Sequence, residues 1–174
     1  MKKIRILIAV LGMDQHEVGA VAVSRLLRDA GMEIIYLGRF NTPAGIIKTS
    51  MEEDADVIGL SCHSWEYLHY MPDLMELMQE QQLNIPVVVG GSVITAGDMA
   101  KLQDMGVAAA FGPSVTNEEI VKKIRHPIRW ASCNAKRSVG IEQISSREFL
   151  FQAQQSFLQV MRQPLVMLGR QRRI

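Results

Sequence analysis

The strongest constraint on the fold is a regular alternation between short apolar runs and longer segments of helical period. Runs rich in Val, Ile and Leu predict strands buried on both faces, at 4–11, 33–38, 56–61, 85–91 and 107–111. Segments with helical spacing of apolar residues follow them, at 16–30, 43–54, 66–82, 95–105 and 117–125. This repeat predicts an α/β fold, a flavodoxin-like doubly wound five-stranded parallel sheet of order 2-1-3-4-5. In such sheets a ligand crevice lies at the carboxyl ends of the strands.

Helix-start signals support this assignment at two places. The stretch "NTPAG" supplies Asn41 or Thr42 as a cap, with Pro43 in the first helical turn. The stretch "SVTNEE" supplies Thr116 or Asn117, followed by acidic residues that the positive end of a helix favours.

The regularity ends after residue 125, so we divide the chain into a domain at 1–125 and a basic extension at 126–174. The extension contains a linker and a predicted amphipathic helix at 145–161. Residues 1–124 hold ten Lys or Arg against sixteen Asp or Glu, whereas 125–174 hold nine against two. This asymmetry predicts that the basic extension meets an acidic surface, and docking on the protein's own body is the favoured interpretation over a partner protein or a polyanion.

The composition indicates a water-soluble globular protein that we expect in the cytoplasm. Hydrophobic residues make up 48% and charged residues 21%, and no run approaches the roughly 20 apolar residues that span a bilayer. The basic and apolar N-terminus lacks the small-residue cleavage site of a secretion signal. Cys62 and Cys133 have neither metal-type spacing nor the number that a disulfide framework needs, so we expect both to be structural and reduced.

Residues suited to binding a ligand, with polar side chains or no side chain, follow three of the predicted strands at the ligand side of the sheet. They are Asp14, His16 and Gly19 after the first strand, Ser61 after the third, and Gly90-Gly91 after the fourth. A neutral imidazole ligates transition metals, and a nearby carboxylate that accepts the other ring N–H fixes its tautomer. One histidine holds a metal ion poorly, so we expect the metal to arrive inside a macrocycle.

Each of these residues, taken alone, also has a structural explanation. Asp14 could be a helix N-cap, His16 a solvated residue of the first helical turn, and Gly90-Gly91 a strand-to-helix turn with close backbone contact or positive φ.

Taken together, D-x-H-x-x-G at 14–19, Ser61 and Gly90-Gly91 resemble the cobalamin-binding domain of adenosylcobalamin-dependent mutases. The likeness is greatest to the C-terminal domain or small subunit of the methylmalonyl-CoA mutase group, and it covers roughly residues 3–125. The stretches "FNTPAGI" and "VVVGGSV" add to it.

The resemblance implies a role for each matching residue. His16 would replace the dimethylbenzimidazole of cobalamin as the lower ligand of cobalt, with Asp14 hydrogen-bonded behind it. The displaced nucleotide tail would enter a slot beside the first helix, lined by Gly19, Ser61, Gly90 and Gly91. Ser61 would hydrogen-bond the base.

One departure concerns the S-x-L motif common in the family, because His63 stands in place of the leucine. His63 could line the tail slot, face the corrin or compete as a ligand.

The implied function is that of a cobalamin-binding subunit of a carbon-skeleton mutase, an isomerase that is inactive without a partner. Adenosylcobalamin is the expected cofactor. The 174 residues leave no room for an acyl-CoA-binding barrel of roughly 250 residues, so a large mutase subunit is the expected partner. The basic extension is a candidate docking element for that subunit, and a homo-oligomer is compatible with the sequence.

Three other functions stay open. One is a corrinoid methyl-transfer protein, although such proteins usually carry a helical cap domain before the cobalamin domain. The others are a cobalamin-binding carrier or regulatory module without mutase activity, and a flavodoxin-like fold that binds no corrinoid. Nucleic acid is not an expected partner, because no DNA-binding motif accompanies the terminal "RQRRI".

Overall fold

The computed structural model describes residues 3–125 of the chain. The strands are β1 (Arg5–Val10), β2 (Glu33–Tyr36), β3 (Val57–Ser61), β4 (Val87–Gly90) and β5 (Ala109–Phe111). The helices are α1 (Val18–Asp29), α2 (Pro43–Glu52), α3 (Tyr67–Glu80) and α4 (Ala96–Asp104). A further helical segment covers residues 117–125.

The strands form one sheet in the order β2-β1-β3-β4-β5, and every neighbouring pair is parallel. The predicted flavodoxin-like fold is therefore confirmed. At the carboxyl edge of the sheet the register places Val10 beside Ser61, Ser61 beside Gly90, and Gly90 beside Phe111. Side chains of one such row lie on the same face of the sheet, so residues far apart in sequence become neighbours there.

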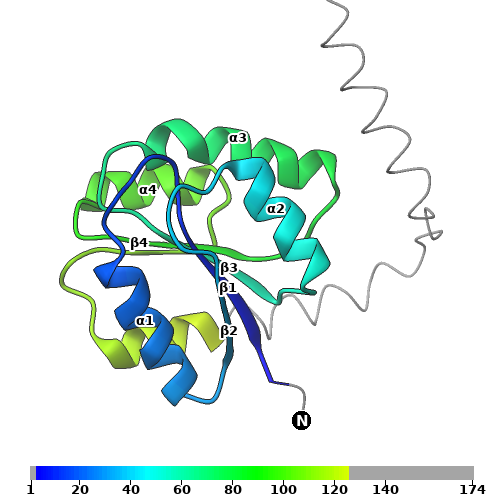
Figure 1. Cartoon of the computed structure of the whole chain (residues 1–174). Helices are drawn as coiled ribbons and strands as arrows, with labels where there is room; N and C mark the ends of the chain where they lie inside the picture. Colours follow the sequence, from blue (N-terminus) through cyan, green and yellow to red (C-terminus); the bar gives the residue numbers. More distant parts are fainter. Residues whose placement is uncertain (1–2, 126–174) are drawn as a thin grey trace, which may run out of the picture. The chain divides into compact units, whose positions relative to one another are not determined.

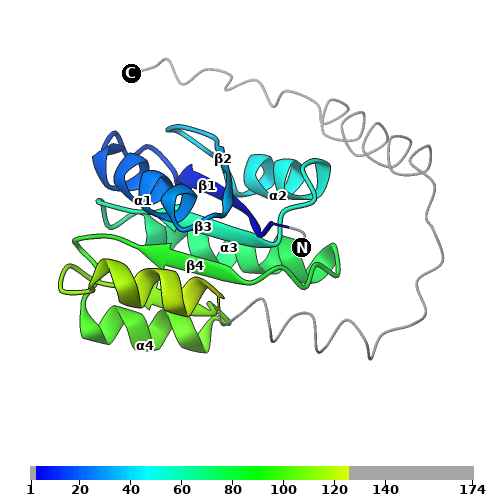
Figure 2. The same cartoon turned by 90° about the horizontal axis from the view of Figure 1, so that it is seen from below.

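The helices cover the two faces unequally, as Figure 1 and Figure 2 show. Side chains of α2, α3 and α4 form the core on one face, with Ile46, Met71 and Leu102 at its centre. On the other face α1 packs beside residues 117–125, and Leu27 and Ile124 close that smaller core. Because the sheet is covered on both sides, β1, β3 and β4 are apolar and buried over most of their length, as the sequence predicted.

The capping predictions are confirmed, with one residue chosen from each pair. Thr42 caps α2, since its Oγ1 accepts the Gly45 N–H at 3.2 Å. Thr116 caps the segment 117–125 by accepting the Glu119 N–H at 3.3 Å. Such caps satisfy N–H groups that have no partner inside the helix.

The observed elements are shorter than predicted at several ends, and the start of α1 matters most. This helix begins at Val18 and not at residue 16, and its N-cap position is Glu17. Asp14 is therefore not a helix N-cap, and His16 does not belong to the first helical turn.

The predicted extension at 126–174, its helix at 145–161 and Cys133 lie outside the described residues. Within residues 3–125, no helix has the length and apolar character needed to cross a membrane. Cys62 is buried, and burial together with the nearby Asp14 charge raises the pKa of its thiol. Its thiol therefore stays protonated, in agreement with the structural role that we expected for it.

Candidate functional site

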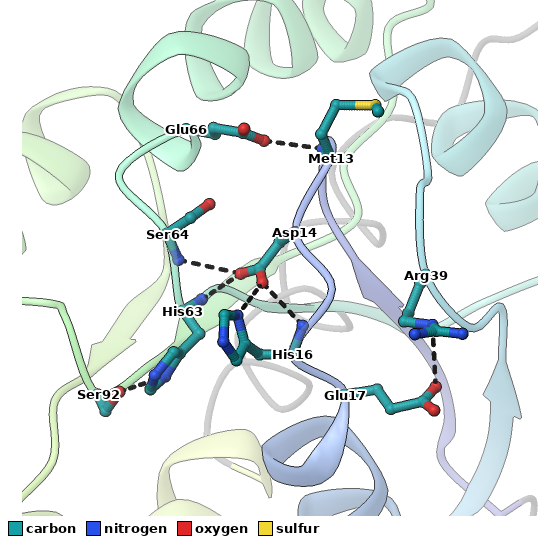
Figure 3. A network of polar contacts seen from close by, with 9 residues as sticks. All are labelled: Met13, Asp14, His16, Glu17, Arg39, His63, Ser64, Glu66 and Ser92. Atoms are coloured by element: carbon teal, nitrogen blue, oxygen red, sulfur yellow. Dashed lines mark hydrogen bonds and ion pairs between the residues drawn. The ribbon is translucent and has the colours of Figure 1, made fainter.

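The turn after β1 holds a buried carboxylate, Asp14, which is 3% exposed. Its Oδ1 accepts the backbone N–H of His16 at 2.9 Å and lies 2.8 Å from the ring Nδ1 of the same residue. Its Oδ2 accepts the backbone N–H groups of His63 and Ser64, which follow β3. As Figure 3 shows, this one carboxylate joins the loops after β1 and β3.

These hydrogen bonds determine the charge of Asp14. Burial by itself would raise the pKa of the carboxyl group, but the hydrogen bonds from His16, His63 and Ser64 stabilise the ionised form more strongly. The pKa of Asp14 is consequently lower than its ordinary value.

An ionised Asp14 fixes the tautomer of His16. A carboxylate only accepts hydrogen bonds, so the Nδ1 of His16 must carry the proton in the 2.8 Å contact. In the neutral ring this leaves the lone pair on Nε2. The His16 side chain is 64% exposed, so a nitrogen able to bind a metal is accessible at the carboxyl edge of the sheet.

A second histidine, His63, packs against the first. The ring centroids of His16 and His63 are 4.4 Å apart, with the ring planes tilted by 46°. The Nδ1 of His63 in turn contacts the hydroxyl of Ser92, which follows β4. Three loops, after β1, β3 and β4, thus meet at the two imidazoles (Figure 3).

A cavity of about 180 Å³ lies between the sheet, α1 and the segment 117–125. Its walls are mostly apolar, and Leu27, Val88 and Ile120 are among them. All four residues that the sequence assigned to a slot also line it, namely Gly19, Ser61, Gly90 and Gly91. Within residues 3–125 the Ser61 hydroxyl has no hydrogen-bond partner, and it faces this space.

Three of the glycines that line the cavity, Gly19, Gly90 and Gly91, lack a side chain for different reasons. A Cβ on Gly19 would come no closer than 3.8 Å to Ser61 Oγ, and one on Gly90 no closer than 3.8 Å to Phe111. The fold therefore has room for a methyl group at both positions, and their bare backbones serve to keep the cavity open. A Cβ on Gly91, in contrast, would lie 1.7 Å from the carbonyl oxygen of Cys62. Gly91 is therefore required by the packing of the chain itself, and not by a φ in the left-handed region.

Residues 4–122 match the family model of the B12-binding domain. The chain belongs to the B12-binding domain family. This membership supports cobalamin as the ligand, and it confirms the resemblance seen in the sequence.

Two small proteins are related to this B12-binding domain over most of their length. The pivalyl-CoA mutase small subunit of Xanthobacter autotrophicus is 37% identical over 121 residues, which cover 70% of this chain and 81% of the relative. The 2-hydroxyisobutanoyl-CoA mutase small subunit of Aquincola tertiaricarbonis is 35% identical over 122 residues, which cover 70% and 90%. The methylmalonyl-CoA mutase of Escherichia coli is 33% identical over 120 residues, but these span only 17% of that enzyme.

Solved structures support the fold of the B12-binding domain. A cobalamin-binding protein from Desulfitobacterium hafniense superimposes with a TM-score of 0.64 at 20% identity, covering 72% of this chain and 60% of the other. A signal receiver domain from Vibrio parahaemolyticus gives 0.63 at 10% identity, covering 80% of this chain and 100% of the other. At such identities the likeness concerns the architecture alone.

The sequence missed several residues that shape this B12-binding domain's candidate site. Gly59 lines the cavity from the middle of β3, and Phe111 lines it from β5. A glycine inside an apolar strand signals a close approach of another group, so Gly59 was detectable. Ser92 was not, because nothing local indicates that its hydroxyl meets His63.

Proposed function

We propose that this chain is the cobalamin-binding subunit of an adenosylcobalamin-dependent acyl-CoA mutase, with His16 as the lower ligand of cobalt. The observation that carries the proposal is the His16–Asp14 pair beside a cavity kept open by Gly19 and Gly90. The family match and the two related small subunits support it.

The state of His16 suits it to this role. Asp14 holds the proton of the neutral ring on Nδ1, so the lone pair of that ring lies on Nε2. The carboxylate behind the ring also raises its basicity as a ligand, as carboxylates do behind many metal-bound histidines.

The cavity suits the displaced dimethylbenzimidazole and part of the nucleotide tail. A cavity of about 150 Å³ with apolar walls admits benzene, and this one measures about 180 Å³. The Ser61 hydroxyl, which lines the cavity, would hydrogen-bond a nitrogen of the base, and Gly90 beside it adds no side chain to that wall. Gly91 lines the same wall, but a glycine is needed there because the Cys62 carbonyl leaves no room for a side chain.

In this proposal the chain's residues bind and orient the cofactor, and the reaction also requires the chemistry of the cofactor and a partner that binds the substrate. Bound adenosylcobalamin supplies radical chemistry through its cobalt–carbon bond. His16 would hold the metal, Asp14 orients His16, and the cavity would remove the tail from water. We propose that a large subunit with an acyl-CoA-binding barrel binds the substrate, so that isomerase activity arises only in that complex, in the cytoplasm.

An apolar rim at the carboxyl edge of the sheet supports a protein partner. The rim consists of Met13, Phe40 and Trp65, which are 66%, 49% and 70% exposed. Its loops adjoin one another, because Gly12 N–H donates to the Asn41 carbonyl at 2.9 Å and Met13 N–H to Glu66 at 2.8 Å. Exposed apolar groups gathered beside a binding site mark a surface for another molecule.

The backbone of Phe40 is a second observation in favour of a protein partner at this rim. Its φ of 64° lies in the left-handed region that bulky residues avoid. Strain of this kind gathers at functional sites. The guanidinium carbon of Arg39 lies over the Phe40 ring, 5.3 Å from its centroid. Arg39 also forms an ion pair with Glu17, with Nε 3.7 Å from the carboxylate oxygen.

A visible-spectrum titration with hydroxocobalamin and adenosylcobalamin tests the ligand assignment. The wild-type chain should bind with dimethylbenzimidazole displaced and a histidine nitrogen on cobalt, whereas His16→Ala should lose that coordination. His69→Ala is the matched control, because His69 is an exposed histidine of α3 outside the candidate site. A free-cobalamin spectrum with both the wild type and His16→Ala would reject the proposal.

A further inference from the structure

The hydrogen bond to Asp14 does not by itself fix the orientation of the His16 ring. It fixes the position of Nδ1, but the ring torsion of a histidine is broad and the side chain is 64% exposed. A ring held at one atom still rocks about that contact. A second contact, on the face of the ring, is needed to define the direction of Nε2.

His63 supplies that contact. Its ring lies 4.4 Å from the His16 ring between centroids, at a tilt of 46°. This distance lies at the short limit of the separations at which aromatic rings attract one another. Within residues 3–125, no other ring contact to His16 is present.

His63 is itself held from two sides, which makes it a rigid support. Its backbone N–H donates to Oδ2 of Asp14, the same carboxylate that holds His16 through Oδ1. Its Nδ1 contacts Ser92 from the loop after β4. Both histidines therefore share one anchor, and the hydroxyl of Ser92 fixes the second ring from the opposite side.

We propose that His63 is a positioning residue, with Ser92 as its anchor, that holds the His16 ring in the orientation in which Nε2 is presented to a metal. The order of the ring is a property of the cobalamin-free protein. The consequence for cobalamin affinity rests on the proposed function.

The first test measures the His16 ring in the full-length, cobalamin-free chain. Ring-carbon NMR relaxation with labelled histidine should show a lower order parameter for His16 in His63→Ala, and a smaller decrease in Ser92→Ala. His63→Phe, which keeps a ring over His16 but cannot bond Ser92, should restore most of the order. His69→Ala should match the wild type. Unchanged order in His63→Ala would overturn the inference.

Urea unfolding of each variant separates this role from a loss of folding. Should His63→Ala fail to fold, the comparison of Ser92→Ala with His63→Phe carries the test, and equal ring order in these two and the wild type would overturn the inference.

The second test measures the consequence for the metal. The aromatic contact is worth about a 2- to 10-fold change in affinity, so His63→Ala should bind cobalamin weaker by that factor. With ¹⁵N-histidine protein and unlabelled cobalamin, the cobalt(II) electron paramagnetic resonance spectrum shows a ¹⁵N doublet only where a protein histidine binds the metal. The doublet fraction should fall in His63→Ala and stay unchanged in His69→Ala.

The outcomes distinguish the two proposals. A wild-type chain without the doublet contradicts the proposed function, while the ring-order measurement still decides the role of His63. A doublet of full intensity and wild-type affinity in His63→Ala contradicts the positioning role and leaves the proposed function standing.

Discussion

At the scale of single residues, Asp14 is the group on which the candidate site depends most. It is nearly inaccessible to water and accepts four hydrogen bonds, two at each oxygen. The backbone donors come from two different loops, so the carboxylate stabilises their arrangement as well as the tautomer of His16. Its charge is retained at neutral pH because those donors compensate for the lost hydration.

We expect Asp14→Asn to reduce the free energy of unfolding by about 2 to 3 kcal/mol at pH 7, because an amide nitrogen cannot accept the N–H groups that face it. The same variant should weaken cobalamin binding by about 10- to 100-fold, as is usual when the carboxylate behind a ligating histidine is lost. Chemical denaturation and the visible-spectrum titration measure the two effects. Wild-type values in both would show that another group orders these loops.

The stability difference between these two proteins should also depend on pH. The pKa of Asp14 is lower in the folded chain than its ordinary value of 3.8, so its contribution is complete well above that value. As the pH falls below 3.8 the unfolded chain takes up the proton first, and the contribution is lost as the pH falls through the lower folded pKa. The difference in the free energy of unfolding between the wild type and Asp14→Asn should therefore become smaller from pH 7 to pH 3. Other carboxyl groups titrate alike in both proteins and do not affect this difference. A constant gap would contradict this assignment.

At the scale of elements, the cavity results from small residues on facing walls. Gly59, Ser61 and Gly90 lie on neighbouring strands, and Gly19 and Ala20 face them from α1. Larger side chains at these positions would fill the space between helix and sheet to the packing density of a protein interior. The open space thus has a cost in stability that only a bound group offsets.

Gly19→Ala and Gly91→Ala should consequently have opposite effects. Gly19→Ala adds a methyl group in a helix, at a position with room for it, so the free energy of unfolding should stay equal or rise by up to about 0.5 kcal/mol. The same methyl group enters the cavity, so cobalamin affinity should decrease. Gly91→Ala places a methyl group 1.7 Å from the Cys62 carbonyl oxygen, so the chain should unfold at lower denaturant concentration. Urea midpoints and cobalamin titrations of both variants measure this. Lower stability in Gly19→Ala would mean that the fold itself needs this glycine.

At the scale of the whole molecule, the apolar rim and the strained Phe40 concern assembly. A side chain forced into the left-handed region costs on the order of 1 kcal/mol, and Phe40 gives little back because its ring is half exposed. The contact with a large subunit that we propose would offset this cost.

We expect Phe40→Gly to keep or raise the stability of the isolated chain and to weaken its complex with a mutase large subunit. Affinity purification from the native cell, with the recovered chain identified and assayed for isomerase activity, provides the partner for a binding measurement. Trp65→Ser, elsewhere on the rim, should weaken the same complex. Recovery of the tagged chain alone, still loaded with cobalamin, would favour the carrier or regulatory module instead.

The sequence determined the fold and the outline of the candidate site. The alternation of apolar runs and helical segments leads to one parallel sheet, because crossovers of this length and hand allow few other topologies. The strand ends of such a sheet share one edge, so Asp14, His16, Ser61 and Gly90 could be placed together without coordinates. Helix α1 begins two residues later than the sequence predicts, because the hydrogen bond from the His16 N–H to Asp14 competes with helical hydrogen bonding there.

The tertiary structure alone decided what each of these residues contacts. Gly90 and Gly91 are adjacent in sequence and alike in composition, yet one keeps a cavity open and the other avoids a carbonyl oxygen. Likewise, only the folded chain shows His63 packed between His16 and Ser92. Local pattern carries the period of a strand or helix, whereas these contacts depend on the register between strands and on the paths of three separate loops, which no single segment of the sequence encodes.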